Sequence, residues 1–425
     1  MGDNKNERLN KKLVEVIRDE KMSSAVRLKK LKYLVALGAD VNSMLYGKSA
    51  LFWAKEVGET DLIEFLEQKG AEVLEVSKEE REKLNKQIWE AIGNENISEI
   101  KRCLEDGADV KLKNEKGDMV LMEIVKKGYD DVVKILIENN VDVDFKNKNG
   151  WTALMVASAY EREEIARMLI ENKADVNAKS HLGTTSLMEA VSYGYNEIAK
   201  MLVENNADVN AKNNEGKTAL MEASKKGYAE IVKCLLEKGA DVNERDEFGR
   251  SEIILAVYGG SVEIVNALIE NKADVNLKDN EGNTALMVAS EYGMIEIAKA
   301  LIKNKAEVNE FNKFCRTALM KASMLGHVEI VKELLRNGVD VNQKDDNERT
   351  ALIWAVNFAK ENVVEVLVKD GADVNQKDKD GNDALSLARK KNACKIVELL
   401  EKEIKEQRKE KKSKFLNKIF RLDER

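Results

Sequence analysis

The side chains best suited to catalysis or metal binding are few and scattered along the sequence. The 425 residues include two histidines and four cysteines, namely His181, His327, Cys103, Cys234, Cys315 and Cys394. Neither histidine lies near a Cys or Ser in a recognisable nucleophile motif. The glycine-rich phosphate-binding motifs GxxxxGK[ST] and GxGxxG are absent from the sequence. The sequence therefore predicts no enzymatic activity.

One short stretch has the composition of a calcium-binding loop. The segment DKDGND at 378–383 offers several carboxylate and amide oxygens. Its glycine is misplaced, however, and the twelfth position would be Arg389, where a calcium loop needs a bidentate Glu. We therefore reject a calcium site, and we expect neither a metal nor another cofactor.

These residues sit within elements that repeat along the chain. The first residue of the phrase ADVN and its variants recurs in steps of 33, at Ala108, Val141, Ala174, Ala207, Ala240, Ala273, Ala306, Val339 and Ala372. A second phrase, usually TALM, keeps the same register from 152–155 to 350–353. Nine anchors in one register indicate an array that grows by stacking and does not enclose one large core.

The unit 213–245 shows what each repeat encodes. Thr218 is predicted to cap a short helix, and Gly227 to end it with a left-handed turn. The following AEIVKCLLEK predicts a second helix with one apolar face, made of Ile231, Val232, Leu235 and Leu236. Gly239 ends this helix, and a polar, turn-rich connection follows. Two short helices cannot bury both apolar faces alone, so the units must stack.

Several motifs in fixed register resemble the ankyrin repeat family over roughly residues 30–400. They are the period of 33, the T-x-L-x-x-A helix start, the mid-unit Gly, E-I-V-x-x-L-L and G-A-D-V-N. The resemblance implies an all-α solenoid of about twelve stacked helix-turn-helix units with short hairpin fingers. It also implies binding along the concave face. We therefore predict a non-catalytic scaffold or adaptor that binds another protein.

The chain departs from the family pattern in one uniform way. Where the family usually has T-P-L-H, this chain has Thr-Ala-Leu-Met, as at 218–221. Losing the His removes a side-chain hydrogen bond that usually ties the turns together, and Met offers only apolar packing there. We expect the fold to hold with altered loop rigidity.

The regularity of the repeats divides the chain into four predicted parts. They are a helical N-terminal cap at 1–42, two degenerate repeats at 43–113, nine repeats of period 33 at 114–400, and a tail at 401–425. Because a solenoid keeps distant units apart, the four cysteines are expected to form neither a disulfide nor a shared zinc site.

Some repeats lack a glycine where the pattern has one. Glu161 replaces the turn glycine, while Lys173, Lys272 and Lys305 replace the glycine that ends the second helix. Each substitution is expected to cost about 1 kcal/mol if the backbone there is left-handed.

Aromatic residues mark the predicted partner-binding surface. They recur at the ends of the first helices and on the fingers, where exposed rings are common anchors of protein interfaces. The predicted contact residues are Trp151, Tyr160, Tyr193, Phe248, Tyr258, Tyr292, Phe311, Phe314, Leu325 and Phe358. The alternative is that these rings pack half-buried on neighbouring repeats, with no partner.

A row of basic residues also follows the repeat. It comprises Lys113, Lys146, Lys179, Lys212, Arg245, Lys278, Lys344 and Lys377 and is broken at Phe311. The row is interpreted as solvated finger charges set by the repeat itself. Selection of an acidic partner segment is the alternative.

The tail differs in charge from the rest of the chain. Residues 401–425 contain ten basic and six acidic residues, whereas the whole chain has a net charge of −7. Phe415, Leu416, Ile419 and Phe420 recur at helical spacing. This pattern predicts either an extension of the last repeat, or a helix that contacts a partner or a membrane surface. The alternative function is therefore a peripheral membrane protein that is anchored by this tail and recruits a partner to the membrane.

Composition limits the remaining possibilities. The net acidic charge argues against bulk binding of nucleic acid. No apolar run approaches the roughly 20 residues that span a membrane, so membrane contact is expected only through the tail. The polar start MGDNKNERLNKK lacks a secretory signal. We therefore expect a cytoplasmic, monomeric protein.

Overall fold

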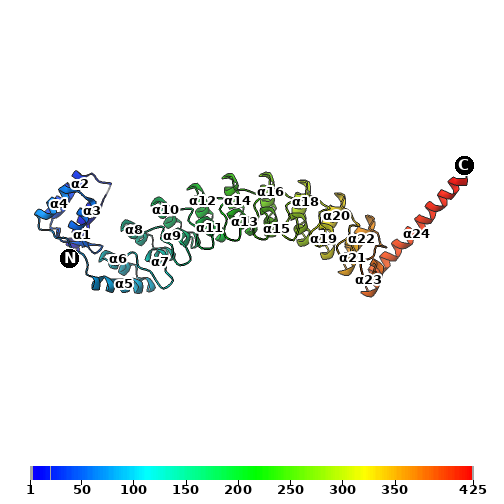
Figure 1. Ribbon diagram of the computed structural model, residues 1–425, viewed down its shortest axis with the longest axis horizontal. Helices are drawn as coiled ribbons and strands as arrows, with labels where there is room; N and C mark the ends of the chain where they lie inside the picture. Colours follow the sequence, from blue (N-terminus) through cyan, green and yellow to red (C-terminus); the bar gives the residue numbers. More distant parts are fainter. Residues whose placement is uncertain (1–2, 20, 424–425) are drawn as a thin grey trace. The chain divides into compact units, whose positions relative to one another are not determined.

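The computed structural model describes residues 3–19 and 21–423, with side chains described within 6–19, 21–407 and 409. Helices dominate these residues, which form 24 helices and one two-stranded hairpin (Figure 1). The chain divides into two compact units, Met1–Glu189 and Ala190–Arg425. The predicted all-α repeat fold is confirmed.

The first unit contains ten complete helices and the hairpin. The helices are α1 (Asp3–Arg18), α2 (Ser24–Ala36), α3 (Ala50–Val57), α4 (Thr60–Gln68), α5 (Lys78–Gly93), α6 (Ile97–Glu105), α7 (Val120–Lys127), α8 (Asp130–Glu138), α9 (Ala153–Ala159) and α10 (Glu163–Glu171). The hairpin pairs β1 (Met44–Leu45) with β2 (Lys48–Ser49), with Met44 opposite Ser49. The next helix, α11 (Ser186–Tyr193), spans the boundary between the units.

The second unit continues the same alternation of short helices. They are α12 (Asn196–Glu204), α13 (Ala219–Lys226), α14 (Ala229–Glu237), α15 (Glu252–Gly259), α16 (Val262–Glu270), α17 (Ala285–Tyr292), α18 (Ile295–Lys303), α19 (Ala318–Leu325), α20 (Val328–Arg336), α21 (Ala351–Asn357), α22 (Glu361–Lys369), α23 (Ala384–Lys390) and α24 (Cys394–Asp423).

Within the second unit the helices pack in two rows. Odd-numbered helices contact odd-numbered neighbours, from α13 on α15 to α21 on α23, and even-numbered helices do likewise. We call the odd-numbered helices from α7 onward inner helices and their partners outer helices. The two rows of the second unit run side by side in Figure 1.

The repeat 213–245 forms the predicted elements. The Thr218 hydroxyl accepts a hydrogen bond from the N–H of Met221 at 3.2 Å, and α13 ends at Gly227, whose φ is 81°. The outer helix α14 follows and leads to Gly239, which is also left-handed. Threonine caps the inner helix in the same way at Thr152, Thr185, Thr284, Thr317 and Thr350.

The recurring ADVN phrase connects neighbouring repeats. The Asn243 side chain accepts a hydrogen bond from the N–H of Asp274 in the next repeat at 2.8 Å, and donates to the carbonyl of Lys272 at 3.4 Å. Equivalent bonds to the next repeat are made by Asn210, Asn276, Asn309 and Asn342. Because each Asn satisfies a backbone donor of the following unit, it holds the stacking register.

The methionines of the TALM phrase belong to the core. Met155, Met221, Met287 and Met320 are each at most 2% exposed. Apolar packing therefore replaces the polar side chain that the family usually has there.

The non-glycine residues at glycine positions adopt the strained conformation that was expected. Glu161, Lys173, Lys272 and Lys305 have φ values of 56°, 64°, 69° and 67°. Each stores about 1 kcal/mol of backbone strain.

The N-terminal helices are fastened to later parts of the first unit. The Arg18 guanidinium lies 4.2 Å from the centre of the Trp53 ring and donates to the carbonyl of Glu138. Lys11 forms an ion pair with Glu105. The departure of residues 43–113 from the regular repeat has a local cause, since α5 has 16 residues where most inner helices have seven or eight. The boundaries of the four predicted parts stay predictions.

The C-terminal tail continues the last outer helix. α24 begins by packing on α22 and α23, with Ile396 and Leu400 buried. It has 30 residues, whereas the other outer helices of this unit have nine, so its later turns extend past its neighbours. The side chains of Phe415, Leu416, Ile419 and Phe420 lie outside the described residues.

Candidate functional site

Exposed rings of the second unit stand at the carboxyl ends of the inner helices. Tyr193 and Tyr292 end α11 and α17 and are each 56% exposed, while Phe358 directly follows α21 and is 49% exposed. Tyr258 on α15 and Leu325 on α19 are exposed to a lesser degree. We call these five residues the inner-face row. Because these side chains are exposed, the hydrophobic core does not depend on burying them.

Neighbouring rings hold part of this row in place. Tyr258 and Tyr292 meet edge to face, with ring centres 5.8 Å apart. Tyr193 stacks on Tyr195 at the same separation. Partial burial raises the pKa of the Tyr258 hydroxyl above its ordinary value. The row thus presents rings that are ordered and still accessible.

The finger aromatics of this unit are also exposed. Phe248, Phe311 and Phe314 each lie beside a cation, with Arg250, Lys278 and Arg316 at 4.7, 5.5 and 5.7 Å from the respective ring centres. Each ring is therefore oriented by a neighbouring cation and retains an open edge.

Two of the predicted contact residues lie in the first unit. Tyr160 follows α9 and is exposed, with the Lys126 ammonium 5.5 Å from its ring centre. Trp151, in contrast, is half-buried, so its ring offers less surface than the prediction assumed.

Three arginines occupy the same finger position but differ in pairing. Arg250 forms an ion pair with Asp246 at 2.6 Å. Arg316 has Asn312 in place of that aspartate. Arg349 does have the aspartate, Asp345, but no ion pair joins them. Among the residues whose side chains are described, neither Arg316 nor Arg349 has an acidic partner or donates a side-chain hydrogen bond.

The tryptophan of α21 explains the free state of Arg349. The indole N–H of Trp354 donates to the Asp345 carboxylate at 3.0 Å, and the other oxygen of that carboxylate accepts backbone N–H groups from Asn347 and Arg349. The Arg316 and Arg349 guanidiniums lie 4.8 and 5.2 Å from the centre of the Trp354 ring. Phe358 stacks on the same ring at 6.0 Å.

We call Phe314, Arg316, Arg349, Trp354 and Phe358 the Trp354 cluster. A hollow of about 30 Å³ lies beside it, lined by Glu291, Arg316, Met320, Lys321, Met324 and Trp354. Sequence reasoning singled out Phe314 and Phe358 and missed the other three members. The signal that could have found them was a recurring arginine just before the capping threonine, followed by a lone tryptophan in an inner helix.

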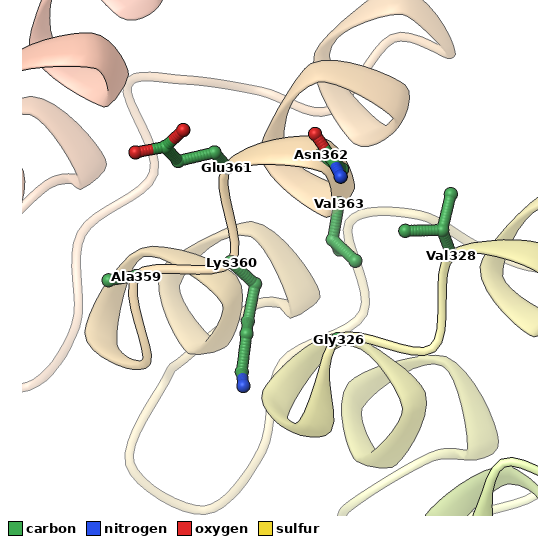
Figure 2. A pocket seen from close by; sticks show the side chains of 7 residues that line it. All are labelled: Gly326, Val328, Ala359, Lys360, Glu361, Asn362 and Val363. Atoms are coloured by element: carbon green, nitrogen blue, oxygen red, sulfur yellow. The ribbon is translucent and has the colours of Figure 1, made fainter.

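A larger, open hollow lies where two repeats turn, and Figure 2 shows it from close by. Its volume is about 290 Å³, and its lining residues are Gly326, Val328, Ala359, Lys360, Glu361, Asn362 and Val363. These residues include no histidine, cysteine or serine. The hollow follows from the turn geometry of the repeat, and we assign it no activity.

A buried acid interrupts the core of the second unit. Glu252 stands where the TALM phrase has its alanine, is fully buried, and has no hydrogen-bond partner for either carboxylate oxygen. Burial raises its pKa to about 8. The preceding Ser251 also fails to cap α15 with its side chain.

The His327 side chain, one of the few candidates for catalysis in the sequence, makes contacts that belong to the fold. The His327 ring packs against Gly293 and its Nε2 lies 3.0 Å from the carbonyl oxygen of Glu291. The four cysteines are free thiols. No cluster of three metal-binding side chains occurs within the part of the chain that the structure describes. In the same part, no helix is long and apolar enough to cross a membrane.

Members of the basic row connect neighbouring fingers. Lys146 donates to the carbonyl of Lys179, and Lys278 donates to the carbonyl of Phe311, both at 3.1 Å. Lys212 forms an ion pair with Glu244. These contacts favour the interpretation of the row as a feature of the repeat itself.

Comparison with known proteins identifies the repeat. A family model described as ankyrin repeats in three copies matches residues 88–180, 175–246, 240–312 and 319–410, which is well over half of the chain. A search of curated proteins found no match. Ankyrin repeats are generally protein–protein interaction modules. From its repeats and from this match, the chain belongs to the ankyrin repeat family.

Proposed function

We propose that this protein is a non-catalytic scaffold that binds another protein along the inner helices of its second unit. The observation that carries the proposal is the inner-face row, in which large side chains stay exposed at positions where the repeat does not require them. The equivalent positions hold Lys226 in α13 and Gly259 in α15. The fold thus tolerates other residues there, and the rings are available for recognition.

The chemistry of these rings suits a protein partner. Tyr and Phe supply large apolar contact area with few rotatable bonds, and they are common anchors of protein interfaces. Losing a central anchor typically costs about 2 kcal/mol or more of binding free energy. Three anchors in one row would therefore dominate an interface of ordinary size.

A capture experiment tests this proposal. Full-length protein and a variant carrying Tyr193→Ala, Tyr292→Ala and Phe358→Ala would each be used to capture proteins from native cell lysate, with mass spectrometry as the readout. The matched control is Tyr33→Ala, which removes an exposed ring from α2. Circular dichroism would establish that all variants fold.

We expect a partner protein that is captured by wild type and by the Tyr33 variant but not by the triple variant. Equal capture by all three proteins would place binding elsewhere and contradict the role of the inner-face row.

A further inference from the structure

The arginines of the Trp354 cluster are cations held in place without a counter-charge. The finger that carries Arg250 has the same backbone design, because Asp246 accepts the N–H groups of residues two and four positions later. Asn312 performs that backbone role for Arg316, with distances of 3.0 and 3.1 Å. An amide can accept these bonds but cannot neutralise an arginine. The finger keeps its shape and loses its ion pair.

Arg349 also lacks an acidic partner, but for a different reason. The Trp354 indole takes the Asp345 oxygen that is equivalent to the one Asp246 gives to Arg250. Both guanidiniums lie over the Trp354 ring, and the Nε–H of each is buried without an acceptor. Two like charges near one ring repel each other, and an anion that contacts both relieves this repulsion. A charged acceptor also forms stronger hydrogen bonds with guanidinium than a neutral one does.

We propose that Arg316, Arg349 and Trp354 form a site for the carboxylate of a single Asp or Glu side chain in a segment of the partner protein. An apolar neighbour of that residue packs on Phe314, which is 52% exposed and lies beside Arg316, or on Phe358, which is 49% exposed and stacks on Trp354. The inference rests on the proposed function, and it specifies the chemistry of the segment that is bound.

The surroundings favour one carboxylate over a polyanion. Asp345, Asp346 and Glu348 belong to the same finger as Arg349, and Glu291 lines the adjoining hollow, where it pairs with Lys321 at 2.6 Å. These acids repel a continuous phosphate backbone, which gains its affinity from many cations in a row. Two free cations with acids around them suit a single acidic side chain in an otherwise uncharged stretch.

Selection from a phage-displayed library of random dodecapeptides on the full-length protein tests the proposal. We expect enrichment of Asp or Glu next to an apolar residue. A selected peptide, labelled with fluorescein, would then be titrated by anisotropy against wild type and three variants. Arg316→Gln with Arg349→Gln should weaken binding about tenfold or more, because two charge-assisted contacts are lost. Arg250→Gln is the matched control and should leave the affinity unchanged.

The remaining variant separates this inference from the proposed function. The Tyr193, Tyr292 and Phe358 triple variant should also lose the peptide, since the proposed function and the acid site share this face. Peptides without acidic enrichment that depend on these rings but not on the two arginines would overturn the acid site and leave the proposed function standing. Selection of no peptide would contradict the acid site. So would a polythymidylate oligonucleotide that binds as tightly as the peptide and depends on the same two arginines.

Discussion

Two regions of the second unit satisfy their charges in opposite ways. Around residues 246–252 the finger arginine is paired with Asp246, while Glu252 in the core behind it has no partner. Around residues 312–358 the TALM core position holds alanine, and the arginines on the surface are unpaired. The backbone role of a finger residue is thus separable from its role as a counter-ion. Repeat stacking constrains the first role only.

The same contrast extends to backbone strain. The finger of Arg250 has Gly249 at its left-handed position, whereas the fingers of Arg316 and Arg349 have Cys315 and Glu348 there, with φ values of 53° and 58°. A non-glycine residue in this conformation costs about 1 kcal/mol. The two fingers whose arginines lack an ion pair therefore also carry more backbone strain.

The largest effect is expected from the unpaired acid of the first region. The pKa of Glu252 is about 8 in the folded protein and 4.5 in the unfolded reference, so the folded state holds a proton that the unfolded chain releases between these values. Stability should therefore fall by about 1.4 kcal/mol per pH unit as pH rises through this window. Glu252→Ala, which restores the alanine of neighbouring repeats, should remove this slope and stabilise the protein at pH 8.

Urea unfolding followed by circular dichroism at pH 5.5 and pH 8 would measure this effect. Glu237→Ala, which removes an exposed acid from α14, is the matched control and should keep the wild-type slope. An unchanged slope in the Glu252 variant would show that this carboxyl group is not the source of the pH dependence.

The next effect comes from converting one region into the other. Asn312→Asp supplies Arg316 with the partner that Arg250 has, and we expect it to weaken binding of the selected acidic peptide about tenfold, by neutralising one of two cations. The Asn283 amide must rotate, because its oxygen now accepts a bond from Asn312 at 2.9 Å. Anisotropy titration measures the change. An unaltered affinity for the peptide would show that the missing ion pair of Arg316 does not matter for binding.

A smaller effect tests the control that Trp354 exerts over Arg349. Trp354→Phe removes the indole N–H that occupies Asp345 and thereby frees this carboxylate to pair with Arg349. Peptide affinity should fall about fivefold, less than for the arginine substitutions, since Arg316 keeps its charge. The same titration would show the loss, and equal or tighter binding would mean that the indole does not keep Arg349 unpaired.

The smallest effect concerns the strained fingers. Cys315→Gly should relieve the left-handed strain but add disorder to the unfolded chain, for a net gain of about 0.5 kcal/mol. The reverse change, Gly249→Ala, should destabilise, because a Cβ atom there would lie 2.4 Å from the Asn280 side-chain oxygen and 2.9 Å from its backbone nitrogen. Thermal unfolding would measure both changes, and a lower melting temperature for Cys315→Gly or a higher one for Gly249→Ala would contradict this view of the fingers.

The fold could be read from sequence because its causes are local and repeated. The Thr218 cap, the Gly227 turn and the left-handed Glu161 each follow from a short motif. The exposed rings could be listed for the same reason, since their positions follow the period, although Trp151 proved half-buried. Their role in binding stays a prediction.

The pairing of the arginines could not be read in this way. It depends on which of two donors, an indole or a guanidinium, reaches one Asp345 oxygen, and Trp354 meets Arg316 only across neighbouring repeats. Glu252 was overlooked for a different reason. Its position in the TALM register marks it as buried, but its lack of a partner is a property of the packed structure.

The most direct test of the unpaired arginines is a titration of their side-chain Nε–H signals by NMR. Protein labelled with nitrogen-15 arginine would be titrated with acetyl-Glu-Phe-amide, with acetyl-Gln-Phe-amide as the control and single Arg→Gln variants for assignment. If Arg316 and Arg349 form the acid site, their signals should shift with the Glu peptide alone, while that of Arg250 stays in place. Equal shifts at Arg250, or equal shifts with both peptides, would contradict it.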